Sequence, residues 1–173
     1  MVALLELESS AQERRAPVLA QVIAAGSAFD PQSPRSGWSR DPTVLAGSLR
    51  EFLQKGDCSP VEINRIVSGA CGHRGADRLE GRLLSAIWKE KELPPVLAPA
   101  ATSGAHGGSL LAGAILAACG QTFGPTPGFA EPDPDLGITP HDGRELPSPN
   151  RVLLSACAAG GAAGWALLGP AHI

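Results

Sequence analysis

Eleven residues near the middle of the chain, Ser109 to Cys119, carry no charge and no strong hydrogen-bonding side chain after the first position. A helix of this composition has no polar face, so its own domain, a partner or lipid must cover it on all sides. Lipid is the weakest of these options, because spanning a bilayer takes about 20 apolar residues and the run ends at Gly108 and Gly120. We therefore expect a central helix that is enclosed between layers.

The side chains of this predicted helix fall into two classes. Small residues, such as Ala114, allow another backbone to approach closely, and four large ones supply apolar area: Leu110, Leu111, Ile115 and Leu116. Burying four such side chains is worth roughly 6–12 kcal/mol at about 1.5–3 kcal/mol each, as much as the net stability of a typical domain. Covering this helix therefore decides whether the chain folds.

Length and net charge limit the classes of protein to which this chain can belong. The 173 residues fit one domain, 1–173, and the net charge of −3 gives no basic footprint for nucleic acid or for a membrane surface. The first residues lack the basic start and long apolar region of a signal peptide. We expect a cytoplasmic protein without a membrane anchor.

The cysteines favour reduced thiols over a disulfide framework or a metal site, because none has CxxC spacing; they are Cys58, Cys71, Cys119 and Cys157. Cys71 and His73 could give two metal ligands, but a site would need more from elsewhere. We expect no metal and no cofactor.

Strand and helix patterns alternate along the chain. We expect strands at 2–8, 17–25, 63–67, 96–99, 151–155 and 165–168, and helical segments at 10–13, 43–55, 59–62, 78–89 and 109–119. Ser10 and Glu13 suggest a capping box, and Asp41-Pro42 an N-cap. A proline-rich surface connection, 123–149, precedes the last two strands. This alternation predicts a layered α/β fold.

Several short strings carry a more specific signal: Val2–Glu8, Gly56–Val67, Gly75-Ala-Asp-Arg-Leu-Glu80, Leu93–Pro99 with Ser103-Gly104, Pro125–Asp135 and Ser155–Gly161. In order and at compatible spacings, they resemble the C-terminal half of β-ketoacyl-acyl-carrier-protein synthases, condensing enzymes of the thiolase fold. The clearest are the similarity to that family's Gly-Asp-x-x-Glu and to its Pro-Pro-Thr-x-Asn-x-x-x-Pro-Asp-Pro. The resemblance implies a layered half of a thiolase-like fold: a mixed sheet with helices on both faces and one buried central helix.

The same alignment implies that catalytic residues have been lost. Gly69 and Ala105 occupy the positions of the family's two histidines, and Ala100 that of its lysine. None of the three can transfer a proton or donate a side-chain hydrogen bond. The family's nucleophilic cysteine belongs to the other half, which this sequence does not contain. Rescue would require His106 as a shifted second histidine, or His73 or Cys71 in a rebuilt site.

Three functions remain open on this basis. The first is a non-catalytic, chain-length-factor-like subunit that assembles with a ketosynthase, or a ketosynthase half, in fatty-acid or polyketide biosynthesis. Acyl carrier protein would then be reached through the partner, and the chain would be an obligate oligomer with the partner bound at Leu110, Leu111, Ala114 and Ile115. The second is a small acyltransferase or thioesterase-like enzyme that uses Cys71 with His73 or His106. The third is a homodimeric scaffold that pairs two central helices.

Overall fold

The computed structural model describes residues 3–89 and 92–171, which form one mixed five-stranded sheet in the order β1-β5-β4-β2-β3. The strands are β1 (Ala20–Phe29), β2 (Ile63–Ser68), β3 (Val96–Leu97), β4 (Arg151–Cys157) and β5 (Ala162–Pro170). β2, β3 and β4 are parallel, β5 is antiparallel to β4, and β1 is antiparallel to β5. The predicted α/β class is confirmed.

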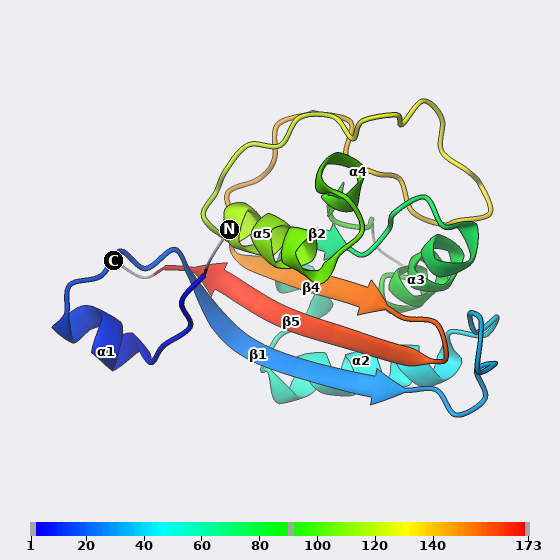
Figure 1. Ribbon diagram of the computed structural model, residues 1–173, viewed down its shortest axis with the longest axis horizontal. Coiled ribbons are helices and arrows are strands. Elements are labelled where there is room, and N and C mark those ends of the chain that lie inside the picture. The colour runs from blue at the N-terminus through cyan, green and yellow to red at the C-terminus, as the bar shows by residue number, and fades with distance from the viewer. Residues whose placement is uncertain (1–2, 90–91, 172–173) are drawn as a thin grey trace.

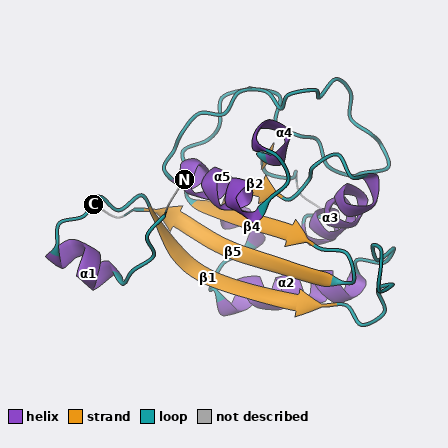
Figure 2. Cartoon of the chain, in the orientation of Figure 1, coloured by secondary structure: helices purple, strands orange, loops and turns teal. Residues whose placement is uncertain are grey.

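Helices lie on both faces of this sheet (Figures 1 and 2). They are α1 (Glu8–Glu13), α2 (Thr43–Lys55), the 3-10 turn η1 (Pro60–Glu62), α3 (Arg74–Ile87), α4 (Ala100–Ser103) and α5 (Gly107–Ala118). α2 and α3 cover one face and enclose the larger hydrophobic core, whereas α5 packs on the opposite face over a smaller one. Trp165 and Leu167 of β5 belong to the first core and Leu168 to the second, as the alternation of a strand requires.

The sequence predicts α2 well. Its apolar face is buried as expected, through Leu45, Leu49, Phe52 and Leu53. At its start, Asp41 Oδ1 accepts hydrogen bonds from the Thr43 N–H at 2.9 Å and from its hydroxyl at 2.6 Å. These bonds satisfy a donor that the first helical turn would otherwise leave free.

The predicted first strand is wrong where the structure describes it. Residues 3–7 form no strand, Val2 lies outside the described residues, and α1 begins at Glu8 without the expected capping box. The reason is the absence of a neighbour: Leu4, Leu5 and Leu7 are 73%, 81% and 75% exposed. A strand without a second strand beside it has no ladder hydrogen bonds to make.

Other element boundaries differ by a few residues. β1 begins three residues and ends four residues later than predicted, and β3 is two residues long because α4 follows it. α3 begins at Arg74, four residues earlier than predicted, because the His73 ring caps it: Nδ1 accepts from the Ala76 N–H at 3.3 Å. The glycine-rich turn between β4 and β5 is shorter than expected, since both strands extend into it.

α5 is enclosed on one side only. Its small residues face the sheet: Ser109, Gly113, Ala114, Ala117 and Ala118 are buried. A Cβ atom on Gly113 would lie 2.8 Å from Pro99 Cγ, so glycine permits the close packing here. The large side chains point the other way, and Leu111 and Leu116 are 44% and 45% exposed. Within the described residues, the predicted central helix is therefore covered by one layer and is not enclosed between two.

No helix in the described ranges is long and apolar enough to span a bilayer.

The buried Arg65 joins the end of α5 to the proline-rich connection. From β2, its guanidinium donates to the Ala117 carbonyl at 2.9 Å and to the Pro147 carbonyl at 3.1 Å. Carbonyls near a helix C-terminus carry partial negative charge and favour a cation. Arg65 therefore positions both the helix and the connection that crosses over it.

Two helical glycines should respond oppositely to alanine. On α3, a Cβ atom at Gly81 would overlap the Leu136 carbonyl oxygen of the connection, whereas a Cβ at Gly47 of α2 would meet nothing within 4 Å. We expect Gly81→Ala to lower the free energy of unfolding by about 2–3 kcal/mol through overpacking. Gly47→Ala should raise it by about 0.5–1 kcal/mol through helix propensity. Urea titrations would test both, and equal effects would contradict the close approach of Leu136.

Candidate functional site

The parallel strands β2 and β4 end side by side, at the edge of the sheet where α/β proteins commonly bind ligands. β2 ends at Ser68 and β4 at Cys157, and the loop from β2 to α3 crosses between them. The Gly69 N–H donates to the Ser155 carbonyl at 2.9 Å, which fixes the start of this loop on β4.

Two carboxylates of α3 hold the rest of the loop. Glu80 accepts from the Ser68 hydroxyl at 2.9 Å and from the Gly69 N–H at 3.3 Å. Asp77 accepts from the Cys71 and Gly72 N–H groups at 3.1 and 2.9 Å. Both side chains are buried, at 5% exposure for Asp77 and 2% for Glu80.

These two acids thus hold the loop at both ends. From the sequence, both are predicted to be first-turn acids that favour the helix dipole; Asp77 does lie in the first turn of α3, whereas Glu80 lies beyond it. The similarity of this string to Gly-Asp-x-x-Glu is the sequence signal that could have identified them.

Burial raises the pKa of Glu80 from 4.5 to about 7. The hydroxyls of Ser155 and Ser68 and the Gly69 N–H lower its pKa, and nearby Asp77 raises it further. The Ser155 hydroxyl lies against the carboxylate without full hydrogen-bond geometry and has no partner among the described residues. No salt bridge to Glu80 is formed within those residues either. The dominant cause is therefore desolvation without a compensating cation.

Glu80 should make the protein less stable as the pH rises. The native state keeps this proton up to pH about 7, whereas the unfolded chain loses it near 4.5. Between these values the native state binds more protons, so the free energy of unfolding falls, by about 3 kcal/mol in total. Glu80→Gln should remove this dependence and stabilise the protein at pH 8, because its amide can also donate to Ser155.

Denaturant titrations from pH 4.5 to 8 would measure this effect. The exposed Glu145→Gln is the matched control and should keep the wild-type slope. A Glu80→Gln protein with that same slope would show that Glu80 is already ionised in the folded state.

The three positions aligned with family catalytic residues offer no acid–base chemistry in the structure. Gly69 lies against β4, where an added Cβ would be 3.2 Å from Ala156 Cα, so a histidine there would require β4 to shift. Ala100 begins α4, and Ala105 is exposed in the turn between α4 and α5. The assignment of these positions to lost catalytic residues stays a prediction.

The two rescue histidines both act as helix caps. His106 precedes α5, and its Nδ1 accepts from the Ser109 N–H at 3.2 Å while Nε2 lies 3.2 Å from the Ser103 carbonyl. His73 caps α3 in the same way, and its ring lies on Trp38 with centroids 5.5 Å apart. In both rings the lone pair on Nδ1 is engaged by the backbone, which leaves it unavailable as a base.

The two cysteines near this edge differ in environment. Cys71 is exposed, and its backbone N–H donates to the Asp77 carboxylate. Cys157 is partly buried, and burial together with Glu80 raises the pKa of its thiol strongly. Among residues 3–89 and 92–171, no three His, Cys, Asp or Glu side chains gather in a way that could hold a metal ion.

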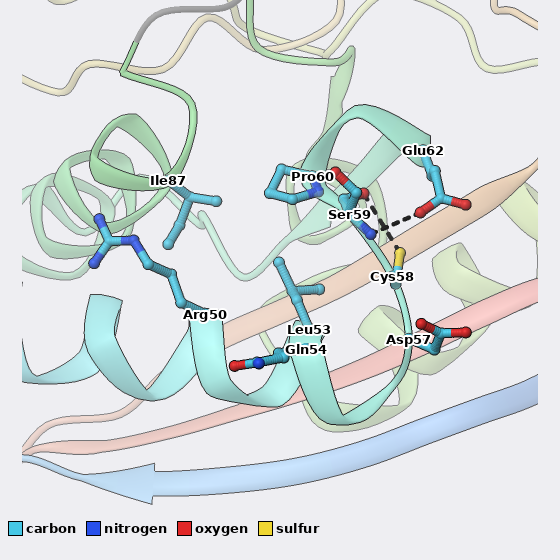
Figure 3. A pocket seen from close by; sticks show the side chains of 9 residues that line it. All are labelled: Arg50, Leu53, Gln54, Asp57, Cys58, Ser59, Pro60, Glu62 and Ile87. Atoms are coloured by element: carbon cyan, nitrogen blue, oxygen red, sulfur yellow. Dashed lines mark hydrogen bonds between the residues drawn. The ribbon is translucent and has the colours of Figure 1, made fainter.

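An open pocket of about 460 Å³ lies away from this edge, between α2, η1 and the end of α3 (Figure 3). Several of its polar groups are already satisfied. Arg50 donates to the Ala86 carbonyl at 2.8 Å, and Glu62 accepts from the Ser59 N–H at 2.7 Å. The buried Cys58 beside them has a raised pKa, mainly through desolvation. We find no group here that is arranged for catalysis.

The most distinctive surface is the partly covered face of the sheet. In Figure 1, α5 lies over β4, while β5 and β1 have no helix in front of them. Ile23, Ala24 and Ala28 of β1 pack into the core under α2, so the remaining side chains point toward the α5 side. Val22 and Phe29 are 45% and 62% exposed there. We name as the docking face the outer side of α5 and this side of β1: Leu110, Leu111, Ile115, Leu116, Val22, Ala25, Ser27 and Phe29.

Three of the four predicted partner-contact residues lie on this face. Leu111 is exposed, and Leu110 and Ile115 are half-buried beside it. Ala114 is fully buried against the sheet of its own chain and faces away from it. Leu116 and the β1 residues are additions that the sequence did not predict.

No family model matches this sequence, and no curated protein matches it. Solved structures do. A ketosynthase titled AntDE:AntF, a type II polyketide synthase acyl-carrier protein in complex with its hexaketide-bound ketosynthase, aligns with a TM-score of 0.85 and 18% identity over 96% of this chain and 42% of its own. The ishigamide ketosynthase/chain length factor aligns at 0.81 and 22%, over 95% and 41%. A ketosynthase from module 1 of the Bacillus amyloliquefaciens bacillaene synthase aligns at 0.79 and 17%, over 95% and 32%.

The chain therefore has the fold of a ketosynthase or chain-length-factor fragment, and the predicted thiolase-like fold is confirmed. It spans less than half the length of these structures.

Proposed function

We propose that this chain is a ketosynthase-like subunit that assembles with a partner condensing enzyme in polyketide or fatty-acid biosynthesis. The partner supplies the nucleophilic cysteine and covers the docking face. The observation that supports the proposal most directly is this face. Helices α2 and α3 cover one side of the sheet, whereas apolar side chains of α5 and β1 stay exposed on the other.

Leaving these apolar side chains exposed to water is unfavourable in free energy. Leu111, Leu116, Val22 and Phe29 are each 44–62% exposed. Strand alternation directs Val22 and Phe29 to the side of the sheet on which α5 lies. Apolar side chains exposed together on a soluble protein mark an interaction site. The small residues of β1 beside them, Ala25 and Ser27, leave room for a helix of the partner to lie alongside α5.

The chemistry of the strand ends supports a subunit without its own activity. Gly69, Ala100 and Ala105 bear no acid, base or nucleophile, and both nearby histidines are used as caps. Two of the aligned structures belong to assemblies, one titled as a ketosynthase with its acyl-carrier protein and one as a ketosynthase/chain length factor. Contact with acyl carrier protein would be made by the partner.

The enzyme alternative needs Cys71 as a nucleophile. In this structure the described residues give that thiol no hydrogen-bond partner, and the His73 Nδ1 already accepts a backbone hydrogen bond. Loss of acyl-thioester probe labelling in a Cys71→Ser protein would favour this alternative over the subunit.

Leu111→Asp should weaken the complex. A carboxylate buried in an apolar interface without a partner is strongly unfavourable, so we expect the dissociation constant to rise at least tenfold. Native mass spectrometry of this chain co-expressed with its genomic neighbours would measure it.

Val61→Asp is the matched control, because Val61 is 56% exposed on η1, outside the docking face. It should leave the complex intact. A wild-type chain that forms no complex with any neighbouring ketosynthase would contradict the proposal, as would a Leu111→Asp complex as stable as that of the control.

A further inference from the structure

The outer side of α3 carries a row of arginines. Arg74, Arg78 and Arg82 follow one another at intervals of four residues, so they lie on one side of the helix and one turn apart. The two acids of the same helix, Asp77 and Glu80, are buried on the side that faces the sheet. The outer side of α3 therefore presents positive charge, although the chain as a whole has a net charge of −3.

Two further arginines extend this row from neighbouring elements. Arg82 Nη1 donates to the Arg40 carbonyl at 3.2 Å, which holds the loop after β1 against α3. Arg50 of α2 donates to the Ala86 carbonyl at 2.8 Å, one helical turn beyond Arg82, and Figure 3 shows its side chain extended toward α3. We name these five residues the arginine surface: Arg40, Arg50, Arg74, Arg78 and Arg82.

One end of the arginine surface already binds carboxylates of its own chain. Asp135 of the proline-rich connection lies 3.4 Å from Arg74 Nη2 and 3.0 Å from Arg78 Nη2, and Asp133 lies 3.6 Å from Arg74 Nη2. The Asp135 side chain is 60% exposed, and those of Arg74 and Arg78 are 68% and 36% exposed. This side of α3 can therefore bind acids that approach from the solvent.

The other end has no acid of its own. Arg40, Arg50 and Arg82 are exposed and form no salt bridge with any residue that the structure describes. The acids next to two of them in sequence are placed elsewhere, since Asp41 caps the start of α2 and Glu51 lines the groove between α2 and β1. Arg50 and Arg82 each use one guanidinium nitrogen to bind a backbone carbonyl, which leaves their other N–H groups without a partner among the described residues.

We propose that the arginine surface binds an acidic segment of another protein. Arginine clusters recognise acidic motifs because each guanidinium can donate two parallel hydrogen bonds to one carboxylate. The carbonyl contacts hold Arg50 and Arg82 in place before binding, so these long side chains lose little freedom when a ligand arrives. A segment rich in carboxylates complements this charge, as Asp135 does within the chain.

The spacing of the row favours a particular form of this segment. Arginines at intervals of four in an α-helix are about 6 Å apart along its axis. In an extended, proline-rich chain, residues at i and i+2 are also about 6 Å apart. An acid at every second position of an extended segment can therefore meet successive arginines of α3.

Binding of a fluorescein-labelled Asp-Pro repeat peptide to the full chain, followed by fluorescence anisotropy, tests the proposal. The dissociation constant should rise about tenfold between about 20 and 200 mM sodium chloride, because salt screens exposed charges. Arg82→Glu should raise it about tenfold at low salt, because an attraction becomes a repulsion. Asp135→Asn should lower it about threefold, because this variant removes the internal carboxylate that competes for Arg74 and Arg78.

Arg144→Glu is the matched control. Arg144 is 87% exposed, lies outside the arginine surface and undergoes the same change of charge, so the dissociation constant should stay within about twofold of the wild-type value. An Asn-Pro repeat peptide should not bind. The inference does not rest on the proposed function, because α3 and the docking face lie on opposite sides of the sheet.

Several results would overturn the proposal. They are a folded chain that does not bind the Asp-Pro peptide at low salt, equal binding of the Asn-Pro peptide, and Arg82→Glu binding as tight as that of Arg144→Glu. An Asp135→Asn protein that binds no more tightly than the wild type would also contradict it. Inorganic polyphosphate that binds where the peptide does not would assign the surface to phosphate instead.

Discussion

The constraint on which this structure depends is that its sheet has two faces to bury, and the chain covers one of them completely and the other in part. α2 and α3 close the first face over a large core. On the second, α5 presents its small residues to β2, β4 and β5, and its large ones to the outside. This choice follows from packing, because small side chains allow the helix to approach the sheet closely, as at Gly113 and Pro99.

Much of this architecture is predictable from periodicity and capping. The apolar face of α2 and the short strand β2 with its preceding turn lie within a residue of their predicted positions. Two of the failures share a cause, which is that a local pattern does not reveal its neighbour. Residues 3–7 look like a strand, but no described strand lies beside them, and the outer side of α5 looks like core, but none of the described residues covers it. Periodicity alone does not reveal the burial of Glu80 and Asp77, because burial of an acid depends on residues that are distant in sequence; only the similarity to Gly-Asp-x-x-Glu singles them out.

At the candidate site, the polar side chains near the ends of β2 and β4 stabilise the local backbone. The loop after β2 is held by Glu80 and Asp77, and the helices that flank this region begin at histidine caps, His73 and His106. Each of these side chains is a carboxylate or an imidazole and could transfer a proton, yet each accepts a hydrogen bond from a backbone N–H group. The interactions that order this edge therefore also occupy Nδ1 of both histidines, while Glu80 keeps a pKa of about 7.

α5 is anchored at both ends by contacts within its own chain. At its start the His106 ring caps the first turn, and at its end the buried guanidinium of Arg65 binds the Ala117 carbonyl. The exposed leucines between these anchors are thus held in place by contacts within the chain itself. A surface that is already ordered loses little conformational entropy if anything binds to it.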